Sequence, residues 1–426
     1  MAEATDRRSR PLSTSGPARL GAKAAKRELG RGERVLPGIF RLRLPLPWPG
    51  VPHCNAWAVT AAGGFVLFDT GMHQPDSLAQ LERALAMCNL RLQDARLGVC
   101  THAHSDHNGQ AATVLERAGC ELWMHPQREH MTRMAEDPEA VLARRLEVAR
   151  QSGVPEEPLR RYASERRTRQ SGISGLIEPD RELVDGVSVE TDVGTWSVHE
   201  TPGHAPSHVC LFEPQRRLLI SGDHLLGRIS LYFDYGYTPD PVGEFLHSLE
   251  VVEALGARLC LPGHGRTFTD VDAHIEGNRR LVRERLASVL EAVSARSLTA
   301  FEVLPHVYGE SLSPENAHWL LSKVLAYLAH QLTDCALRII GAATAEEEHR
   351  VLLAERIEAP VRAARLPNQL PRRILFAPDG GHEVLKFGRR VRHLCDTGEV
   401  DPGQDLQKIE GTVDLSFRKD HRHNRE

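Results

Sequence analysis

With 426 residues, of which 41% are hydrophobic and 26% charged, the chain has the composition of a globular protein with room for two or three domains. A formal net charge of −4 shows no overall excess of positive charge, which argues against a protein devoted to nucleic-acid binding. The eight cysteines form no Cys-x-x-Cys pair, and no apolar run reaches the roughly 18 residues of a membrane-spanning helix. We therefore expect a cytoplasmic protein without a disulfide framework and without a membrane partner.

The start of the chain differs in composition from the rest of the sequence. Residues 1–34 are rich in Ala, Arg, Ser, Gly and Pro and show little apolar periodicity, which predicts a disordered basic arm. Arg7-Arg8-Ser9-Arg10 is similar to a twin-arginine export signal, but no apolar segment comes after it. We therefore expect no export.

From Val35 onward, short apolar segments of strand character alternate with segments of helical spacing. The first group predicts five strands, at 39–44, 53–60, 65–68, 97–100 and 121–124, and two helices, at 77–88 and 110–118. The second group predicts five more strands, at 187–189, 196–199, 209–212, 217–220 and 258–261, and a helix at 242–255. This alternation is typical of an α/β fold.

The stretch with the most metal-ligand character is Thr101-His102-Ala103-His104-Ser105-Asp106-His107, directly after the strand expected at 97–100. It places three imidazoles and one carboxylate in six consecutive positions, a ligand set for zinc or iron. His102 and His104 lie two positions apart, so in an extended loop both can face one ion. Asp106 and His107 can then face a second ion.

Four further polar residues follow other short apolar strands. They are Asp69, His204, Asp223 and His264. Strand ends in a sheet of this kind lie along one edge, so these side chains and the histidine loop are expected to converge.

Residues 126–180 are polar and predict a helical insertion with a basic run between Arg160 and Arg169. Two interpretations remain open for this segment. It is either a solvated insertion, or a lid over the site whose arginines attract an anionic substrate.

Taken together, the motifs resemble those of the metallo-β-lactamase-fold hydrolases. They are His102-Ala103-His104-Ser105-Asp106-His107, Gly203-His204, Gly222-Asp223 and Gly263-His264-Gly265, with Asp69 upstream. The resemblance covers about residues 36–272. It implies an αββα sandwich, in which two mixed β-sheets pack face to face with helices outside.

The resemblance also implies the roles of the site residues. One divalent ion is expected on His102, His104 and His204, and a second on Asp106, His107 and His264. Asp223 is expected to bridge the two ions, and Asp106 also to orient the nucleophile. Asp69 is expected to support the histidine loop without binding a metal. The ions are expected to be Zn²⁺, with Fe or Mn as alternatives, and to share a hydroxide nucleophile.

The ligand set favours some activities of this family over others. Zinc-dependent β-lactamases lack the bridging aspartate, whereas Asp223 is present and makes the set similar to that of glyoxalase II, the lactonases and related endoribonucleases. We expect hydrolysis of a small thioester, ester or lactone. A single-strand endoribonuclease that binds RNA is the alternative, and a persulfide dioxygenase with one iron is a minor one. The Gly-x-Ser-x-Gly signature of serine hydrolases does not occur.

After the catalytic domain, expected at 35–272, a helical domain is expected at 273–366. Helical spacing occurs at 271–292, 298–309, 314–332 and 346–366. Parts of this region resemble the winged-helix domain appended to lactamase-B-like thioesterases and endoribonucleases, although residues 333–350 lack the glycine turn and strands of the wing. Residues 367–426 form a C-terminal extension that matches no family. The sequence predicts no oligomeric state.

Overall fold

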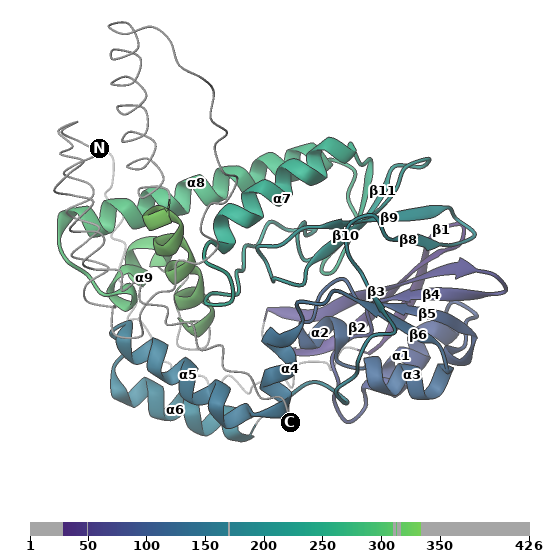
Figure 1. The fold of residues 1–426 in the computed structure, drawn as a ribbon, viewed down its shortest axis with the longest axis horizontal. Helices are drawn as coiled ribbons and strands as arrows, with labels where there is room; N and C mark the ends of the chain where they lie inside the picture. The colour runs from purple at the N-terminus through teal and green to yellow at the C-terminus, as the bar shows by residue number, and fades with distance from the viewer. Residues whose placement is uncertain (1–28, 49, 169–170, 310–311, 313–316, 334–426) are drawn as a thin grey trace, which may run out of the picture.

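Two β-sheets packed face to face form the body of the protein, with helices on both outer faces (Figure 1). The computed structural model describes residues 29–48, 50–168, 171–309, 312 and 317–333. Residues 1–28 of the expected arm, most of the wing segment, the helix expected at 346–366 and the extension at 367–426 lie outside the described residues.

The first sheet has seven strands, which neighbour one another in chain order. They are β1 (Arg31–Leu36), β2 (Ile39–Trp48), β3 (Val51–Ala61), β4 (Gly64–Phe68), β5 (Ala95–Val99), β6 (Glu121–Met124) and β7 (Arg181–Glu182). Strands β1 to β4 are antiparallel, and β4 to β7 are parallel. The sheet is therefore mixed, and its parallel half places the ends of β4 and β5 side by side.

The second sheet has five strands in the order β12-β11-β10-β9-β8. They are β8 (Ser188–Glu190), β9 (Thr195–Glu200), β10 (Val209–Glu213), β11 (Leu218–Gly222) and β12 (Leu259–Pro262). Only β11 and β12 run parallel, and the other neighbours are antiparallel.

Apolar side chains from both sheets fill the space between them. Trp57, Val59 and Phe68 of the first sheet meet Trp196, Leu211 and Ile220 of the second in one buried cluster. The rings of Phe68 and Trp196 lie 5.9 Å apart, a typical distance for a packed aromatic pair.

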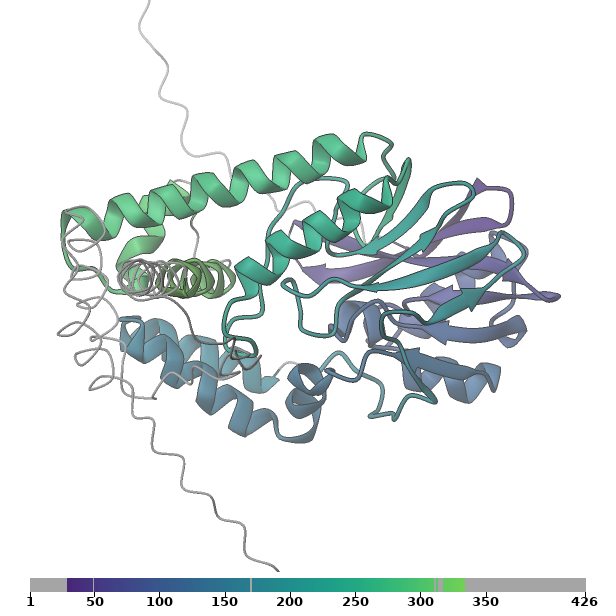
Figure 2. The same ribbon diagram turned by 45° about the horizontal axis from the view of Figure 1, so that its top comes forward.

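Helices cover the two outer faces of the sandwich. On the first sheet, α1 (Ser77–Ala86) and α3 (Ala111–Ala118) pack on the strands through Leu81, Leu85 and Val114. A short 3₁₀ helix, η1 (Leu92–Asp94), and α2 (Ser105–Asn108) lie before and after β5. On the second sheet lie α7 (Pro241–Leu255) and α8 (Val271–Ala295), shown side by side in Figure 2. The expected αββα sandwich is confirmed.

The boundaries of α7 reflect its sequence. Asp240 at the N-cap accepts a hydrogen bond from the Gly243 amide, and Pro241 occupies the first helical position, where its missing N–H costs nothing. Gly256 ends the helix at φ 62°, a left-handed conformation that glycine adopts without strain.

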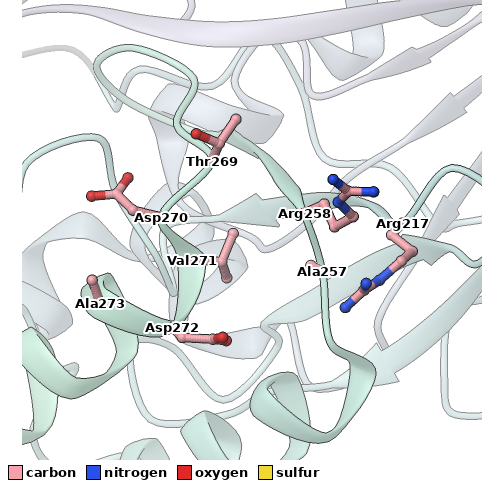
Figure 3. A pocket seen from close by; sticks show the side chains of 8 residues that line it. All are labelled: Arg217, Ala257, Arg258, Thr269, Asp270, Val271, Asp272 and Ala273. Carbon is pink, nitrogen blue, oxygen red and sulfur yellow. The ribbon is translucent and has the colours of Figure 1, made fainter.

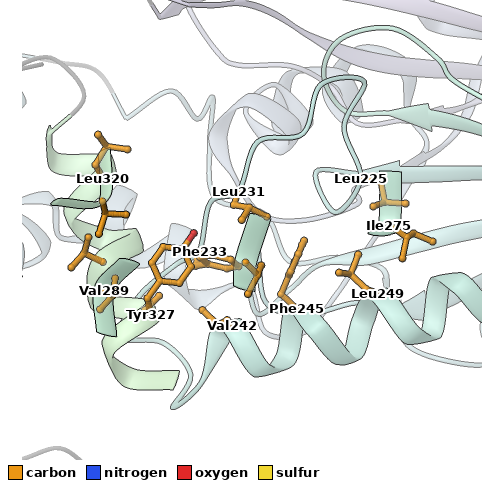
Figure 4. Close-up of a cluster of buried hydrophobic side chains, with 14 of the residues drawn as sticks. Leu225, Leu231, Phe233, Val242, Phe245, Leu249, Ile275, Val289, Leu320 and Tyr327 are labelled. Atoms are coloured by element: carbon orange, nitrogen blue, oxygen red, sulfur yellow. The ribbon is translucent and has the colours of Figure 1, made fainter. Parts of the chain in front are cut away.

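The outer core of the second sheet continues into the C-terminal helices. Beyond α8 lie α9 (Ala300–Tyr308) and a helix over 317–333. Figure 4 shows Leu231 and Phe233 from the loop after β11 among Phe245 of α7 and Tyr327. One apolar cluster therefore joins that loop to the catalytic sandwich and to the C-terminal helices.

The insertion at 126–180 is helical, with α4 (Glu129–Glu136), α5 (Pro138–Gln151) and α6 (Glu156–Thr168). Two arginines of the expected basic run pair within the insertion: Arg160 with Glu156 at 3.7 Å, and Arg167 with Glu139 at 3.2 Å. All four side chains are more than half exposed, so these pairs add little stability.

Two elements differ from the sequence expectation. The arm was expected to extend to residue 34, which is wrong for residues 31–34, because they pair with β2 and Glu33 forms an ion pair with Arg41. Strand β7 was not expected. Both segments are too polar to show the alternation on which strand prediction depends.

Candidate metal centre

The candidate site lies where strands of both sheets end. Asp69 follows β4 and the histidine loop follows β5, two adjacent parallel strands. Asp223 and His264 follow β11 and β12, the parallel pair of the second sheet, and His204 lies in the loop after β9. The structure therefore brings all eight predicted site residues together.

Three histidines form the first cluster. His102, His104 and His204 each offer a ring nitrogen within 4.8 Å of the others, and all three side chains are at most 14% exposed. His104 Nδ1 lies 3.0 Å from His204 Nε2. The buried Nε2 of His102 has no hydrogen-bond partner among the described residues.

The second cluster combines two carboxylates with two imidazoles. Asp106 Oδ2 lies 3.1 Å from His264 Nε2 and 3.5 Å from His107 Nε2. Asp223 lies 3.3 Å from the same two nitrogens, through Oδ2 to His264 and through Oδ1 to His107. Asp223 Oδ2 is also 3.7 Å from His204 Nε2. This carboxylate therefore joins the two clusters.

Asp69 contacts two residues of the histidine loop. Its carboxylate lies 2.8 Å from His107 Nδ1 and accepts hydrogen bonds from the backbone and hydroxyl of Thr101. With the Thr101 hydrogen donated to Asp69, the hydroxyl oxygen accepts from His102 Nδ1 at 3.0 Å. The Nε2 atoms of His102 and His107 then face the other candidate ligands, and each offers a lone pair when its ring is neutral. Asp69 itself has a φ of 61°, a left-handed conformation uncommon outside glycine.

The pKa shifts of the histidines differ between the two clusters. In the first cluster, burial and neighbouring imidazoles hold the pKa of His102 well below its ordinary value and lower the pKa of His204 to about 4, whereas Asp234 outweighs burial at His104 and raises its pKa. In the second cluster burial acts in the same direction, but Asp223 and Asp106 outweigh it. They raise the pKa of His107 well above its ordinary value and that of His264 to about 10.

The donor set fits divalent metal ions. Three buried atoms, His102 Nε2, His107 Nε2 and Asp223 Oδ1, make no hydrogen bond in the described part of the chain, although the last two lie within ion-pair distance of each other. Unpaired buried polar atoms are costly, and a cation among them would satisfy all three. The raised pKa values mean that His107 and His264 each carry one extra proton. A divalent ion in place of these two protons would leave the net charge of the cluster unchanged.

Histidines and tyrosines near the motifs have different surroundings. His208 is satisfied: it contacts the Thr201 hydroxyl at 2.8 Å and accepts a hydrogen bond from the Asp223 amide at 3.0 Å. Tyr232 lies at the site, with its ring 5.6 Å from that of His204. His208 therefore fixes the backbone of Asp223, whereas Tyr232 borders the first cluster.

Two site residues were not found by sequence reasoning. Asp234 Oδ2 lies 2.8 Å from His104 Nε2, and His130 of α4 lies beside Asp234. Neither belongs to a motif. The only signal in the sequence was the position of Asp234 shortly after Asp223 and Tyr232 in a segment without regular structure.

A surface hollow of about 460 Å³ lies elsewhere (Figure 3). Arg217, Ala257 and Arg258, which line it, precede β11 and β12, whereas Asp223 and His264 follow these strands. The hollow is therefore at the opposite end of the strands from the candidate metal centre.

Comparison with known proteins agrees with this geometry. The profile of the metallo-beta-lactamase superfamily matches residues 49–264, which is half of the chain and includes every candidate ligand. The chain belongs to the metallo-beta-lactamase superfamily. The expected resemblance is thereby confirmed.

Relatives in this superfamily include hydrolases and solved structures. The probable metallo-hydrolase YqjP of Bacillus subtilis is 27% identical over 290 residues, 64% of this chain and 87% of that protein. The atrochrysone carboxyl ACP thioesterase of Aspergillus chevalieri is 29% identical over 167 residues, 36% of this chain and 52% of that enzyme. A metallo-beta-lactamase family protein of Thermus thermophilus superposes with a TM-score of 0.61 at 26% identity, covering 71% of this chain and 95% of that one. The protein is a metal-dependent hydrolase of this superfamily.

The described helices include none that combines the length and the apolar character needed to span a membrane.

Proposed function

We propose that the protein is a dinuclear zinc hydrolase that acts on a small thioester, ester or lactone. The observation that carries this proposal is the pair of buried clusters joined by Asp223. Nitrogen and oxygen atoms of these clusters lie together and three of them make no hydrogen bond among the described residues. In this proposal His102, His104 and His204 hold one ion. Asp106, His107 and His264 hold the other, and Asp223 contacts both.

Two divalent ions bound there would supply a water of lowered pKa and a positive charge for the substrate oxygen. The side chains of the protein would orient the attacking water. Burial alone would raise the pKa of Asp106 and Asp223, but His107 and His264 outweigh it and hold both values low. Both carboxylates therefore stay ionised and can accept a hydrogen bond from the attacking water.

Two observations support a small ester-like substrate. One relative is a thioesterase, although the match spans only about half of that enzyme. The arginines Arg160 and Arg167 pair with glutamates of the insertion, which leaves less unpaired positive charge for an RNA backbone. The six cysteines of the described part are free, which supports the cytoplasmic location we propose.

A substrate panel with metal analysis tests the proposal. Acyl-CoA, acyl-glutathione, a lactone and single-stranded RNA are incubated with the full chain, with and without a chelator. We expect about two zinc ions per chain and chelator-sensitive hydrolysis of a thioester, ester or lactone. Hydrolysis that survives complete removal of metal contradicts the proposal. So does one iron per chain with oxygen consumption on a persulfide substrate, or cleavage of RNA alone.

A further inference from the structure

Asp234 is held in place by its backbone. Its amide donates to the His204 carbonyl at 3.2 Å, and the Ser322 hydroxyl donates to the Phe233 carbonyl at 2.9 Å. Phe233 is fully buried, with its ring 5.5 Å from Phe245 and 5.7 Å from Tyr327 (Figure 4). The carboxylate that comes after Phe233 is therefore fixed relative to the sandwich.

The Asp234 carboxylate determines which nitrogen of His104 carries the proton. Asp234 Oδ2 is 2.8 Å from His104 Nε2, and the two side chains are only 11% and 14% exposed. Because an ionised carboxylate only accepts hydrogen bonds, His104 donates from Nε2. In the neutral ring the lone pair is then on Nδ1, which lies 3.0 Å from His204 Nε2 in the first cluster.

The helical insertion reaches Asp234 through His130 on α4. His130 Nδ1 lies 3.1 Å from the Gln127 carbonyl and donates to it, which leaves a lone pair on Nε2. That buried Nε2 has no hydrogen-bond partner in the described structure and lies 3.8 Å from Asp234 Oδ2. His130 therefore packs beside the same carboxylate oxygen that contacts His104, with its ring 5.7 Å from the His104 ring and without a hydrogen bond to Asp234.

Three further contacts join the insertion to the loop that carries Asp234. The Tyr237 hydroxyl donates to the His130 carbonyl at 3.3 Å. The guanidinium of Arg144 on α5 donates to the Gly236 carbonyl at 3.0 Å and lies over the Tyr237 ring at 5.9 Å. The insertion and the loop thus form one contact surface around Asp234.

A third metal ion is the competing interpretation, because His104, His130 and Asp234 offer ligand atoms within 4.8 Å of one another. An ion there would need the Nε2 lone pair of His104. His104 would then have to give up the proton that its 2.8 Å contact with Asp234 holds in place. The hydrogen bond accounts for this geometry without that loss.

We propose that Asp234 is a positioning residue for the first metal position, where it fixes the ring and tautomer of His104, and that His130 braces it from the helical insertion. The proposal rests on the dinuclear site proposed above. It adds to that site a carboxylate outside the superfamily motifs and a function for the insertion.

The test compares Asp234→Asn with wild type in the full chain. Stepwise zinc affinity is measured by competition with a chromophoric chelator, and the absorption spectrum is recorded after loading one and two equivalents of Co²⁺. Outer partners of metal-binding histidines are worth about 10–100-fold in affinity, so we expect one of the two ions to bind that much more weakly. The Co²⁺ bands of that ion should shift, whereas the other ion should bind as in wild type. Asp94→Asn is the matched control, because Asp94 pairs with Arg91 at the surface and should change neither ion.

His130→Asn is the second variant, and it removes the imidazole beside Asp234 while His104 and Asp234 stay unchanged. We expect a smaller loss for the same ion, with the thermal midpoint of both variants checked by circular dichroism. Wild-type affinity for both ions in folded Asp234→Asn overturns the positioning role, and wild-type affinity in His130→Asn overturns the brace. A third ion in wild type that both variants lose establishes a metal site in its place. If wild type fails to bind two ions, the dinuclear proposal itself falls, which is a separate result.

Discussion

The two clusters of the candidate metal centre reach the same burial with opposite electrostatics. The first cluster consists of the imidazoles of His102, His104 and His204, and Asp234 contacts only the outer nitrogen of His104. The other cluster places the carboxylates of Asp106 and Asp223 among its own ligand atoms.

This difference affects how each cluster acquires a cation. In the second cluster the negative charge of the two carboxylates is already balanced by protons on His107 and His264, whose pKa values are raised. In the first cluster burial keeps His102 and His204 neutral, and only His104, beside Asp234, has a raised pKa. We infer that the second position competes with protons for its metal, whereas the first depends on Asp223 and Asp234 for negative charge.

The largest expected effect comes from His104→Ala, which removes a proposed ligand and the partner of Asp234 together. Hydrolysis of the best substrate of the panel should fall by more than the ~100-fold upper range for loss of an outer partner. The measurement is kcat/KM, with folding checked by circular dichroism. His247→Ala is the control, because His247 is 75% exposed on α7. Retained activity in folded His104→Ala would contradict the proposal of a dinuclear site.

Asp69→Asn should have the next largest effect, and it tests whether the two clusters have separate supports. Asp69 contacts His107 directly and reaches His102 only through Thr101, so zinc affinity should fall most at the second position, by about 10–100-fold. The same competition assay serves here, with Asp192→Asn as control, since Asp192 accepts the Ala62 amide in an exposed turn. If Asp69→Asn weakens mainly the ion that Asp234→Asn weakens, the comparison between the clusters is wrong.

The smallest effect is a difference in pH dependence between the two ions. A histidine must lose its proton to bind metal, and the pKa of His264 is raised to about 10 while that of His107 is raised well above its ordinary value. Affinity at the second position should therefore rise with pH across the neutral range, by up to about tenfold per unit for each displaced proton. At the first position His102 and His204 are already neutral and only His104 has a raised pKa, so affinity there should change less with pH. Stepwise affinities at three pH values check this, and equal slopes contradict it.

Much of the site could be predicted because its residues carry local signals. Asp69, the histidine loop, Asp223 and His264 each follow a short apolar strand, and buried parallel strands show as apolar runs. The layer arrangement came from the family resemblance. Strand β1 and the two-residue strand β7 gave no such signal, because their residues are mostly polar and form strands only by pairing with a neighbour.

By itself, the sequence determined the types and order of the candidate ligands and the strands that end beside them, because spacing and apolar period are local properties of the chain. Only the tertiary structure decided that Asp234 meets His104 across 130 positions and that His130 reaches it from the insertion. Those contacts depend on where the apolar cluster around Phe233 places the loop after β11, and packing between distant segments leaves no periodic trace in either one.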